Sequence, residues 1–366
     1  MTEPRNLPPV PLANCTLRQF VHVTIGGTQL RVRLSNAYGR NPVTVKSAHI
    51  ALAAGAGSAG NGEVDPATDK ALTFHGAATT TIAPGEDVLS DPLDYKLPAL
   101  TNLAITIYFG DISATVLNGH PGSRTTSFIK SGDVVSAPNM AGAKTTEHWY
   151  IITGVEVQAP DSSKAVVVLG DSITDGRGST TDGNNRWPDD LARCLATNAP
   201  TTGVAVVNMG IGGNTVLRGG LGPTAEARFD RDVLGQSGAR WLIIFEGVND
   251  IGGSRGLVVA TNLINAFEQF IDKAHAHGLR VYGATITPFG TSFYDRGGHV
   301  AAQQAVNDWI RNSGRFDAVI DFDAAVRDPA NPNKLLPAYD SGDHLHLSPA
   351  GYQAMAEAIP LKLFGQ

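Results

Sequence analysis

Four short polar motifs carry the residue types that acyl transfer by a serine hydroxyl needs. In chain order they are Gly170-Asp171-Ser172-Ile173, Asn208-Met-Gly-Ile-Gly-Gly213, Gly247-Val-Asn249-Asp250 and Asp343-His-Leu-His346. This chemistry needs a nucleophile, a base that takes its proton, a group that orients the base, and hydrogen-bond donors for the oxyanion. The four motifs together supply a candidate for each part.

Three of these motifs follow segments with the pattern of buried strands. Ala165–Gly170 is a continuous apolar run bounded by turn residues, as in strands covered on both faces of a parallel sheet. Further strands are expected at Val204–Asn208, Trp241–Phe245, Arg280–Ile286 and Ala318–Asp321, with helices at Asn262–His277, at Ala301–Asn312 and after Ser348-Pro349. Alternating strands and helices predict a parallel α/β sheet, and ligands bind beyond the carboxyl ends of its strands. The motifs are therefore expected to meet at one sheet edge.

The first part of the chain has the pattern of an all-β domain. Val21–Ile25 and Thr28–Leu34 flank Gly26-Gly27, a two-residue signal that predicts a β-hairpin. More strands are predicted at Val43–Leu52, Leu103–Phe109 and Trp149–Val157. Many short strands favour a β-sandwich or jelly roll. The predicted organisation is an N-terminal β-sandwich domain over residues 1–158, a linker, and an α/β domain over residues 164–366.

The composition argues against two classes of binding partner. The chain of 366 residues has a formal net charge of −6 and no Lys/Arg run, so neither nucleic acid nor an anionic membrane surface is an expected partner. No apolar segment approaches the ~20 residues that span a bilayer. Met1–Pro9 has no hydrophobic core and is not a signal peptide, which fits a cytosolic protein or a mature secreted chain. Cys15 and Cys194 could form a disulfide, although the favoured interpretation is that both are free thiols.

The four motifs, in this order, resemble those of the SGNH (GDSL-type) hydrolases, a superfamily of esterases and lipases on a flavodoxin-like, doubly wound parallel sheet. The resemblance covers roughly Lys164–Phe364. It implies that Ser172 is the nucleophile, that His346 is the general base and that Asp343 orients His346. The backbone N–H groups of Ser172 and Gly213 and the side chain of Asn249 would form the oxyanion hole. No catalytic metal or organic cofactor is implied.

Other segments resemble a bacterial and fungal subgroup that carries a β-rich domain ahead of the hydrolase. They are Arg186–Ala192, Phe322–Pro329 and Ser341–His346 in the catalytic half, and Leu17–His22 and Arg31–Asn36 in the leading domain. Members of this subgroup are often secreted and are predicted to deacylate carbohydrates. The resemblance implies a secreted serine esterase that acts on short-chain, acetyl-type esters of small molecules or glycans, while a cytoplasmic location stays open. The sequence gives no indication of the oligomeric state.

Two other functions are compatible with the same residues. One is a carbohydrate-binding protein with a degenerate hydrolase domain, although the intact motifs argue against degeneration. The other is an acyltransferase, in which the same site transfers the acyl group to a sugar or alcohol instead of water. Product analysis with added acceptor alcohols separates the acyltransferase from the esterase.

Two residues compete for the catalytic roles. His344 lies two positions before His346, but the Asp-x-x-His spacing favours His346 as the base. Ser254 stands in Gly252-Gly-Ser-Arg-Gly256, which fits the Gly-x-Ser-x-Gly turn of α/β-hydrolases. That turn directly follows a strand, whereas the preceding strand is expected to end near Phe245, so Ser254 is interpreted as a loop residue. Three acidic residues are expected to hold the local backbone, namely Asp171, Asp175 and Asp250.

Overall fold

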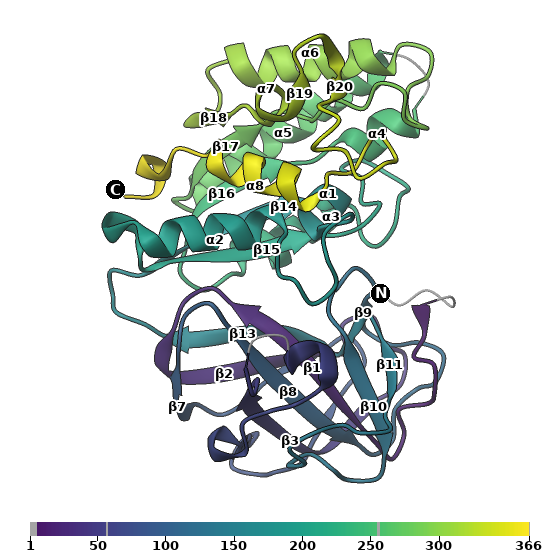
Figure 1. Cartoon of the computed structure of the whole chain (residues 1–366), viewed down its shortest axis with the longest axis vertical. Helices are drawn as coiled ribbons and strands as arrows, with labels where there is room; N and C mark the ends of the chain where they lie inside the picture. The colour runs from purple at the N-terminus through teal and green to yellow at the C-terminus, as the bar shows by residue number, and fades with distance from the viewer. Residues whose placement is uncertain (1–5, 56–57, 255–256, 366) are drawn as a thin grey trace. The chain divides into compact units, whose positions relative to one another are not determined.

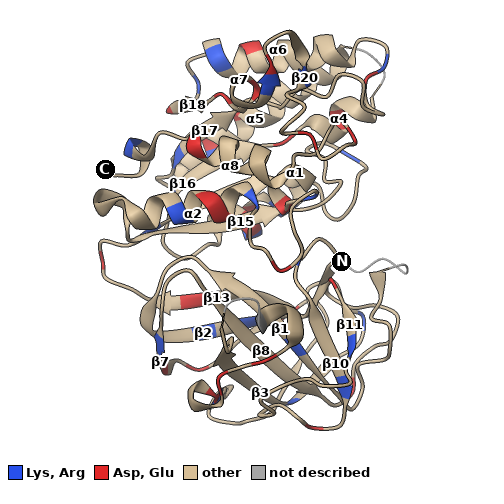
Figure 2. Cartoon of the chain, in the orientation of Figure 1, with Lys and Arg blue, Asp and Glu red and all other residues tan. Residues whose placement is uncertain are grey.

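The computed structural model describes residues 6–55, 58–254 and 257–365. Two compact units make up the chain, one of Met1–Ala159 with Thr181–Asn184 and one of Pro160–Thr180 with Asn185–Gln366. Lys and Arg residues are spread along many elements of both units (Figure 2). Within the described ranges, no helix has the length and apolar character needed to cross a membrane.

The N-terminal unit is built from antiparallel strands (Figure 1). They are β1 (Cys15–Val23), β2 (Gly27–Ser35), β3 (Val43–Leu52), β4 (Lys70–Ala71), β5 (Thr80–Ile82), β6 (Asp87–Leu89), β7 (Leu93–Leu97), β8 (Thr101–Phe109), β9 (Gly119–His120), β10 (Ser127–Ser131), β11 (Lys144–Thr146), β12 (Trp149–Tyr150) and β13 (Ile152–Gln158), with 3₁₀ turns at Ser58–Asn61 and Pro66–Thr68. One sheet has the order β11-β10-β1-β8-β3-β4, with β5 on β3. The second has the order β13-β2-β6, with β7 on β2, while β9 and β12 pair separately.

Apolar side chains of both sheets share one core. Alternate residues of β2 over Leu30–Leu34 are at most 1% exposed and pack in the same cluster as Leu17 of β1. On the opposite face of β2, Arg31 and Arg33 both pair with Glu156 of β13, at 2.6 and 2.5 Å. The predicted strand alternation and the predicted β-sandwich are confirmed.

The predicted hairpin at Gly26-Gly27 is wrong. β1 pairs with β8 and β10, whereas β2 pairs with β6, β7 and β13, so the two glycines carry the chain from one sheet to the other. Neither glycine has the positive φ that the favoured two-residue hairpin turns need. Glycine is required here for another reason: a Cβ would lie 2.4 Å from the Leu97 carbonyl oxygen at Gly26, and 2.6 Å from that of Gln158 at Gly27.

The single strand predicted over Trp149–Val157 is interrupted at Ile151. This residue has a φ of 68°, in the left-handed region that β-branched residues rarely adopt. The Ile151 side chain is buried, its N–H donates to Asn118 O at 3.0 Å, and its carbonyl accepts from Ser35 N at 2.7 Å. Because the apolar pattern continues through Ile151, the sequence does not mark the point where the chain passes from β12 to β13.

The C-terminal unit is a doubly wound α/β sheet. Its strands are β14 (Lys164–Gly170), β15 (Val204–Gly210), β16 (Ala239–Phe245), β17 (Arg280–Ala284) and β18 (Ala318–Ile320), with a small pair β19 (Arg327–Asp328) and β20 (Asn331–Leu335). The five main strands are parallel in the order β15-β14-β16-β17-β18. This is the flavodoxin-like order 2-1-3-4-5, so the predicted fold class is confirmed.

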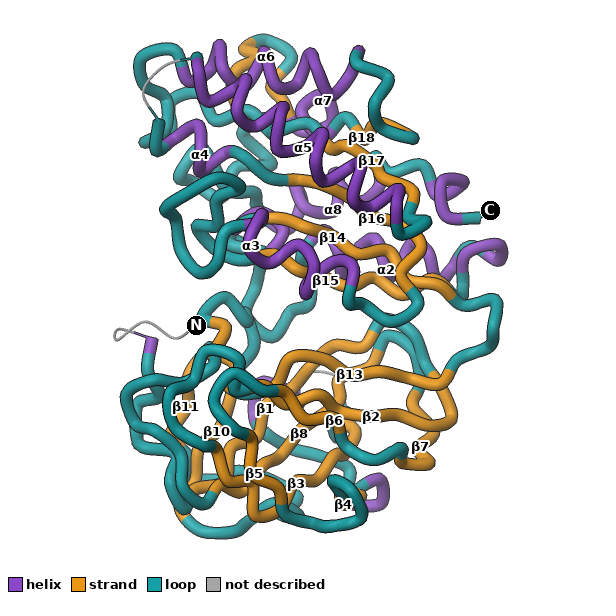
Figure 3. Tube along the Cα trace, turned by 180° about the vertical axis from the view of Figure 1, so that it is seen from behind, coloured by secondary structure: helices purple, strands orange, loops and turns teal. Residues whose placement is uncertain are grey.

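Helices cover both faces of this sheet. They are α1 (Ser172–Asp175), α2 (Trp187–Thr197), α3 (Ala225–Phe229), α4 (Val248–Gly252), α5 (Val258–Ala276), α6 (His299–Asn312), α7 (Phe322–Val326) and α8 (Pro349–Glu357), with 3₁₀ turns at Ala199–Thr201 and Leu361–Phe364 and a π-helical turn at Asp230–Leu234. Figure 1 shows α2 and α8 in front of the sheet, and the reverse view in Figure 3 shows α3 and α5 on the other side. The stripe predicted on α5 is buried, each member at most 3% exposed: Leu263, Phe267, Phe270 and Ile271.

Candidate active site

The first motif forms the turn from β14 into α1. Asp171 is the N-cap of α1, and its Oδ1 accepts from the Ile173 N–H at 3.0 Å. Ser172 is then the first helical residue, and its side chain is buried. Only glycine fits at position 170, because a Cβ there would lie 2.2 Å from Oγ1 of Thr174. The sharp turn therefore places Ser172 directly at the carboxyl end of β14.

The second motif joins the end of β15 to the same helix. Asn208 Nδ2 donates to Thr174 O at 2.9 Å, and the Gly212 N–H donates to Asp175 Oδ2 at 3.0 Å. Gly213, the next residue, has a φ of 71°, which glycine adopts without strain. Asp175 thus anchors the glycine-rich turn, as the sequence predicted, and the backbone of Gly213 is held near α1.

The third motif forms α4 and contacts the loop after the glycine-rich turn. Asn249 Nδ2 donates to the carbonyl oxygen of Asn214 at 2.8 Å. Both carboxylate oxygens of Asp250 accept backbone N–H groups, from Val216 at 2.8 Å and from Leu217 at 3.0 Å. Asp250 therefore anchors this loop, as predicted.

The fourth motif completes a hydrogen-bonded series with Ser172. His346 Nε2 lies 2.8 Å from Ser172 Oγ, and His346 Nδ1 lies 2.7 Å from Asp343 Oδ2. An ionised carboxylate only accepts, so Nδ1 carries the ring hydrogen and Nε2 is free to accept the serine proton. The structure thus brings Ser172, His346 and Asp343 together, although Ser172 and His346 are 174 residues apart in the sequence.

The charge of Asp343 is stabilised by its hydrogen bonds. Partial burial raises the pKa of Asp343, but hydrogen bonds from the ring and backbone of His346 and from the Leu345 N–H outweigh burial. The net result is a pKa well below the ordinary value of an aspartate. Asp343 therefore remains an anion that can orient and stabilise the neighbouring imidazole.

Both competing residues lie outside this series. His344 is about half exposed, and its Nδ1 contacts Asp340 Oδ2 at 2.5 Å. Ser254 follows α4, not a strand, and its hydroxyl donates to Ile251 O at 2.8 Å. The last two residues of its motif, Arg255 and Gly256, lie outside the described residues.

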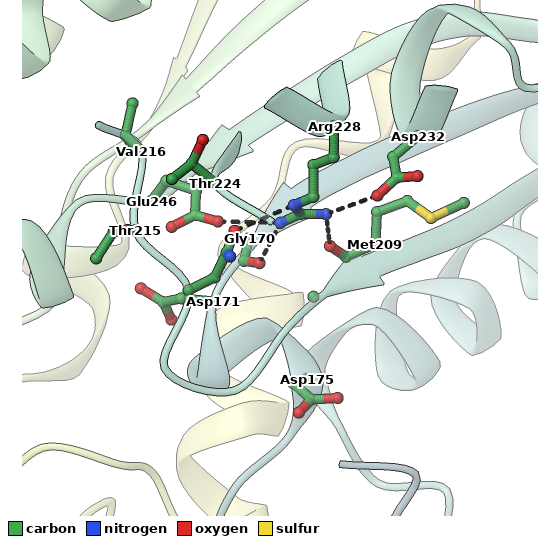
Figure 4. Close-up of polar contacts among 12 residues, drawn as sticks. Gly170, Asp171, Asp175, Met209, Thr215, Val216, Thr224, Arg228, Asp232 and Glu246 are labelled. Carbon is green, nitrogen blue, oxygen red and sulfur yellow. Dashed lines mark hydrogen bonds and ion pairs between the residues drawn. The ribbon is translucent and has the colours of Figure 1, made fainter. Parts of the chain in front are cut away.

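A buried arginine that the sequence analysis missed ties the motifs together. Arg228 of α3 is 1% exposed, and Figure 4 shows its guanidinium among acceptors from several elements. It donates to Gly170 O (3.0 Å), Met209 O (2.6 Å), Asn214 Oδ1 (3.0 Å), Asp232 Oδ2 (3.3 Å) and Glu246 Oε1 (3.2 Å). One cation thus joins the carboxyl ends of β14, β15 and β16 to the glycine-rich turn. Glu246 is a sequence signal that could have indicated it, because a carboxyl group that is buried directly after a strand must either pair with a cation or take up a proton.

Burial also changes the protonation of the carboxyl groups in this cluster. Burial and the negative charges of Asp250 and Asp175 raise the pKa of Asp171, while the hydrogen bond from Ile173 and the charge of Arg228 oppose this, and the net result is about 7. Burial raises the pKa of Glu246 well above its ordinary value, the charge of Asp171 adds to this, and Arg228 opposes it.

The raised pKa of Asp171 predicts a pH-dependent stability. The pKa of Asp171 is 3.8 in the unfolded chain and about 7 in the folded protein. Between pH 3.8 and about pH 7 the folded state therefore binds more protons at Asp171 than the unfolded state does, so the stability of the fold decreases as the pH rises through this range. Asp171→Asn keeps an oxygen acceptor for Ile173 and removes the titration. We expect its Tm to match wild type near pH 4 and to exceed it at pH 8, measured by thermal melts. A difference in Tm that does not change with pH would contradict this assignment.

Cys15 and Cys194 are free thiols, and burial raises the pKa of both. Among the residues that the structure describes, no group of three or more His, Cys, Asp or Glu side chains is placed to hold a metal ion.

Comparison with known proteins defines the class of this enzyme. Residues 168–354, a little more than half of the chain, match the GDSL-like lipase/acylhydrolase family. The protein is thus a hydrolase, and it belongs to the GDSL-like lipase/acylhydrolase family. No match was found among curated proteins.

Solved structures similar to this chain include two bacterial proteins. Axe2, an acetylxylan esterase from Geobacillus stearothermophilus, is 23% identical, with 53% of this chain and 91% of Axe2 covered and a TM-score of 0.41. A GDSL-like lipase from Bacteroides thetaiotaomicron is 20% identical, with 55% of this chain and 88% of that protein covered and a TM-score of 0.43.

Proposed function

We propose that the protein is a serine esterase that hydrolyses carboxylic esters through an acyl-serine intermediate. The observation that carries this proposal is the series Ser172–His346–Asp343, with contacts of 2.8 and 2.7 Å. These distances lie within the range in which a base can take the proton of a nucleophile.

The proposed reaction has two steps. Ser172 Oγ attacks the ester carbonyl carbon while its proton moves to His346 Nε2, and the departing alkoxide takes that proton as the ester C–O bond breaks. Water then attacks the acyl-serine, giving one proton to His346 Nε2, and the carboxylic acid leaves as Ser172 Oγ recovers the proton. Asp343 stays ionised and stabilises the imidazolium that forms in each step.

Three donors are proposed for the oxyanion. Among the described residues, neither the Ser172 N–H nor the Gly213 N–H donates to a protein acceptor, which leaves both for substrate. The Asn249 amide has two hydrogens, and only one is directed to Asn214 O. Donors held in place before the reaction stabilise the developing charge without reorganisation.

The proposed substrate is a short-chain, acetyl-type ester, with a carbohydrate as the natural alcohol component. This finer part of the proposal rests on the resemblance of the segments around Arg186–Ala192 and Ser341–His346 to the subgroup with a leading β-rich domain.

Hydrolysis of p-nitrophenyl acetate, butyrate and octanoate tests the proposal. We expect activity that falls as the acyl chain lengthens, and a fluorophosphonate probe bound covalently to the peptide that contains Ser172. Adding alcohol acceptors should leave free acid as the main product. Absence of both hydrolysis and labelling, or labelling at Ser254, would overturn the esterase proposal. A preference for octanoate would overturn only the short-chain part, and transfer to the added alcohols would favour the acyltransferase.

A further inference from the structure

The amide of Asn249 has one orientation, and its partners determine it. The carbonyl oxygen of Asn214 can only accept, so the amide nitrogen of Asn249 must face it, at 2.8 Å. The amide oxygen then faces the hydroxyl of Tyr294, at 2.9 Å. Because the amide oxygen accepts only, the tyrosine hydroxyl is the donor of this hydrogen bond.

Tyr294 is itself held firmly against α4. Its ring packs so closely on Gly252, at the end of α4, that a Cβ there would lie 2.3 Å from the ring carbons. Its backbone carbonyl accepts from the Arg296 N–H at 2.9 Å and lies 2.7 Å from His299 Nδ1. The exposed Phe293 ring packs against the Tyr294 ring, with centroids 4.4 Å apart. The Tyr294 ring is thus fixed against α4, the helix that carries Asn249. Its hydroxyl can therefore set the direction of the Asn249 amide.

The Tyr294 hydroxyl also stays protonated. Burial raises its pKa, and the negative charges of Asp171 and Asp250 raise it further. A neutral hydroxyl that donates to the amide oxygen polarises the amide and makes its N–H groups stronger donors. The contact therefore affects both the direction and the strength of the Asn249 N–H.

We propose that Tyr294 is a positioning residue for the oxyanion donor Asn249, so that its hydroxyl contributes to the rate of ester hydrolysis without touching the reacting atoms. This inference rests on the proposed esterase function. Without the hydroxyl, Asn214 O is the one hydrogen-bond partner that the described residues leave to the Asn249 amide, and the amide can tilt about its last side-chain bond. The free N–H then points less accurately at the oxyanion, which forms only during the reaction, so kcat falls while KM changes little.

A double-mutant cycle on p-nitrophenyl acetate tests this role. Removing an oxyanion donor lowers kcat by about 10²–10³-fold, which we expect for Asn249→Ala. For Tyr294→Phe, which keeps the donor but not its alignment, we expect a loss of about tenfold in kcat. The combined variant should match Asn249→Ala within about twofold, because Tyr294 has no amide left to position. Tyr282→Phe is the matched control, since it also removes a tyrosine hydroxyl that donates to an oxygen, Leu363 O at 2.6 Å, and its kcat should stay near wild type.

Other results would show whether the positioning role of Tyr294 or the esterase function itself is wrong. If Tyr294→Phe keeps full kcat while Asn249→Ala is slow, the positioning role is wrong and the esterase function stands. If the two losses multiply in the combined variant, Tyr294 acts independently of Asn249 and the inference is likewise overturned. A wild-type protein that hydrolyses no ester overturns the proposed function itself. Binding of a trifluoromethyl ketone, which forms an oxyanion on Ser172, should weaken in Tyr294→Phe as kcat falls, and thermal melts should show that the variant is folded.

Discussion

Replacing Ser172 by alanine should lower kcat on p-nitrophenyl acetate by about 10⁵–10⁶-fold, because the variant lacks the hydroxyl that forms the proposed acyl intermediate. His346→Ala should be almost as slow, since Ser172 Oγ, 2.8 Å from the ring, would have no base to take its proton. The two losses should not add, because each variant already removes the function of the pair. Asp343→Ala should lose less, about 10⁴-fold, because the imidazole remains and only its orientation and stabilisation are lost.

Ser254→Ala is the control for this series. Its hydroxyl donates to Ile251 O at the end of α4 and has no part in the proposed chemistry, so kcat should stay near wild type. Steady-state kinetics measure kcat for the single variants and for the Ser172–His346 double variant, and so show whether the losses add. Losses that multiply in the double variant, or more than a few per cent of activity left in Ser172→Ala, would contradict the proposed roles.

Replacing Arg228 by methionine should lower the free energy of unfolding by about 3–5 kcal/mol. Methionine fills a similar volume but leaves Glu246, whose side chain is fully buried, without its cation. It also leaves the carbonyl oxygens of Gly170 and Met209 without the hydrogen bonds that Arg228 donates. Urea denaturation of the whole chain, followed by a signal from the C-terminal unit, should show a lower midpoint with an unchanged slope.

Two companion variants test the cause of this loss. Arg231→Met removes an arginine that also pairs with Asp232 but whose own side chain is exposed; pairs with an exposed arginine contribute about 0–1 kcal/mol, so its midpoint should shift little. Adding Glu246→Leu to Arg228→Met removes the buried acid and should recover part of the loss. If Arg228→Met and Arg231→Met have equal midpoints, the buried cation is not what stabilises the strand ends.

The catalytic half could be predicted well because its signals are local and repeated. Each strand of the parallel sheet is a short apolar run, and the stripe on α5 follows the helical period. The motifs at the sheet edge also carry their own turn chemistry, as in the Asp171 cap and the tight Gly170 position. Local sequence therefore places the secondary structure and most of the candidate site.

Partners that lie far apart in the chain could not be predicted in this way. Gly26-Gly27 has the composition of a hairpin, but β1 and β2 find better partners in different sheets. Arg228 and Tyr294 act through acceptors on other elements, Asn214 and Asn249 among them, and nothing beside them in the sequence indicates these contacts. What the sequence misses is the set of long-range hydrogen bonds that hold the motif residues in place.

The placement of β1 and β2 in different sheets has a consequence for synthesis on the ribosome. β1 pairs with residues 101–108 and 128–131, and β2 completes its sheet only with residues 152–158. Chains with such distant pairings have a high contact order and fold in milliseconds to seconds. The apolar residues of β1 and β2 therefore wait unpaired during translation, exposed to aggregation or chaperone binding, until the last strand of the sandwich has emerged.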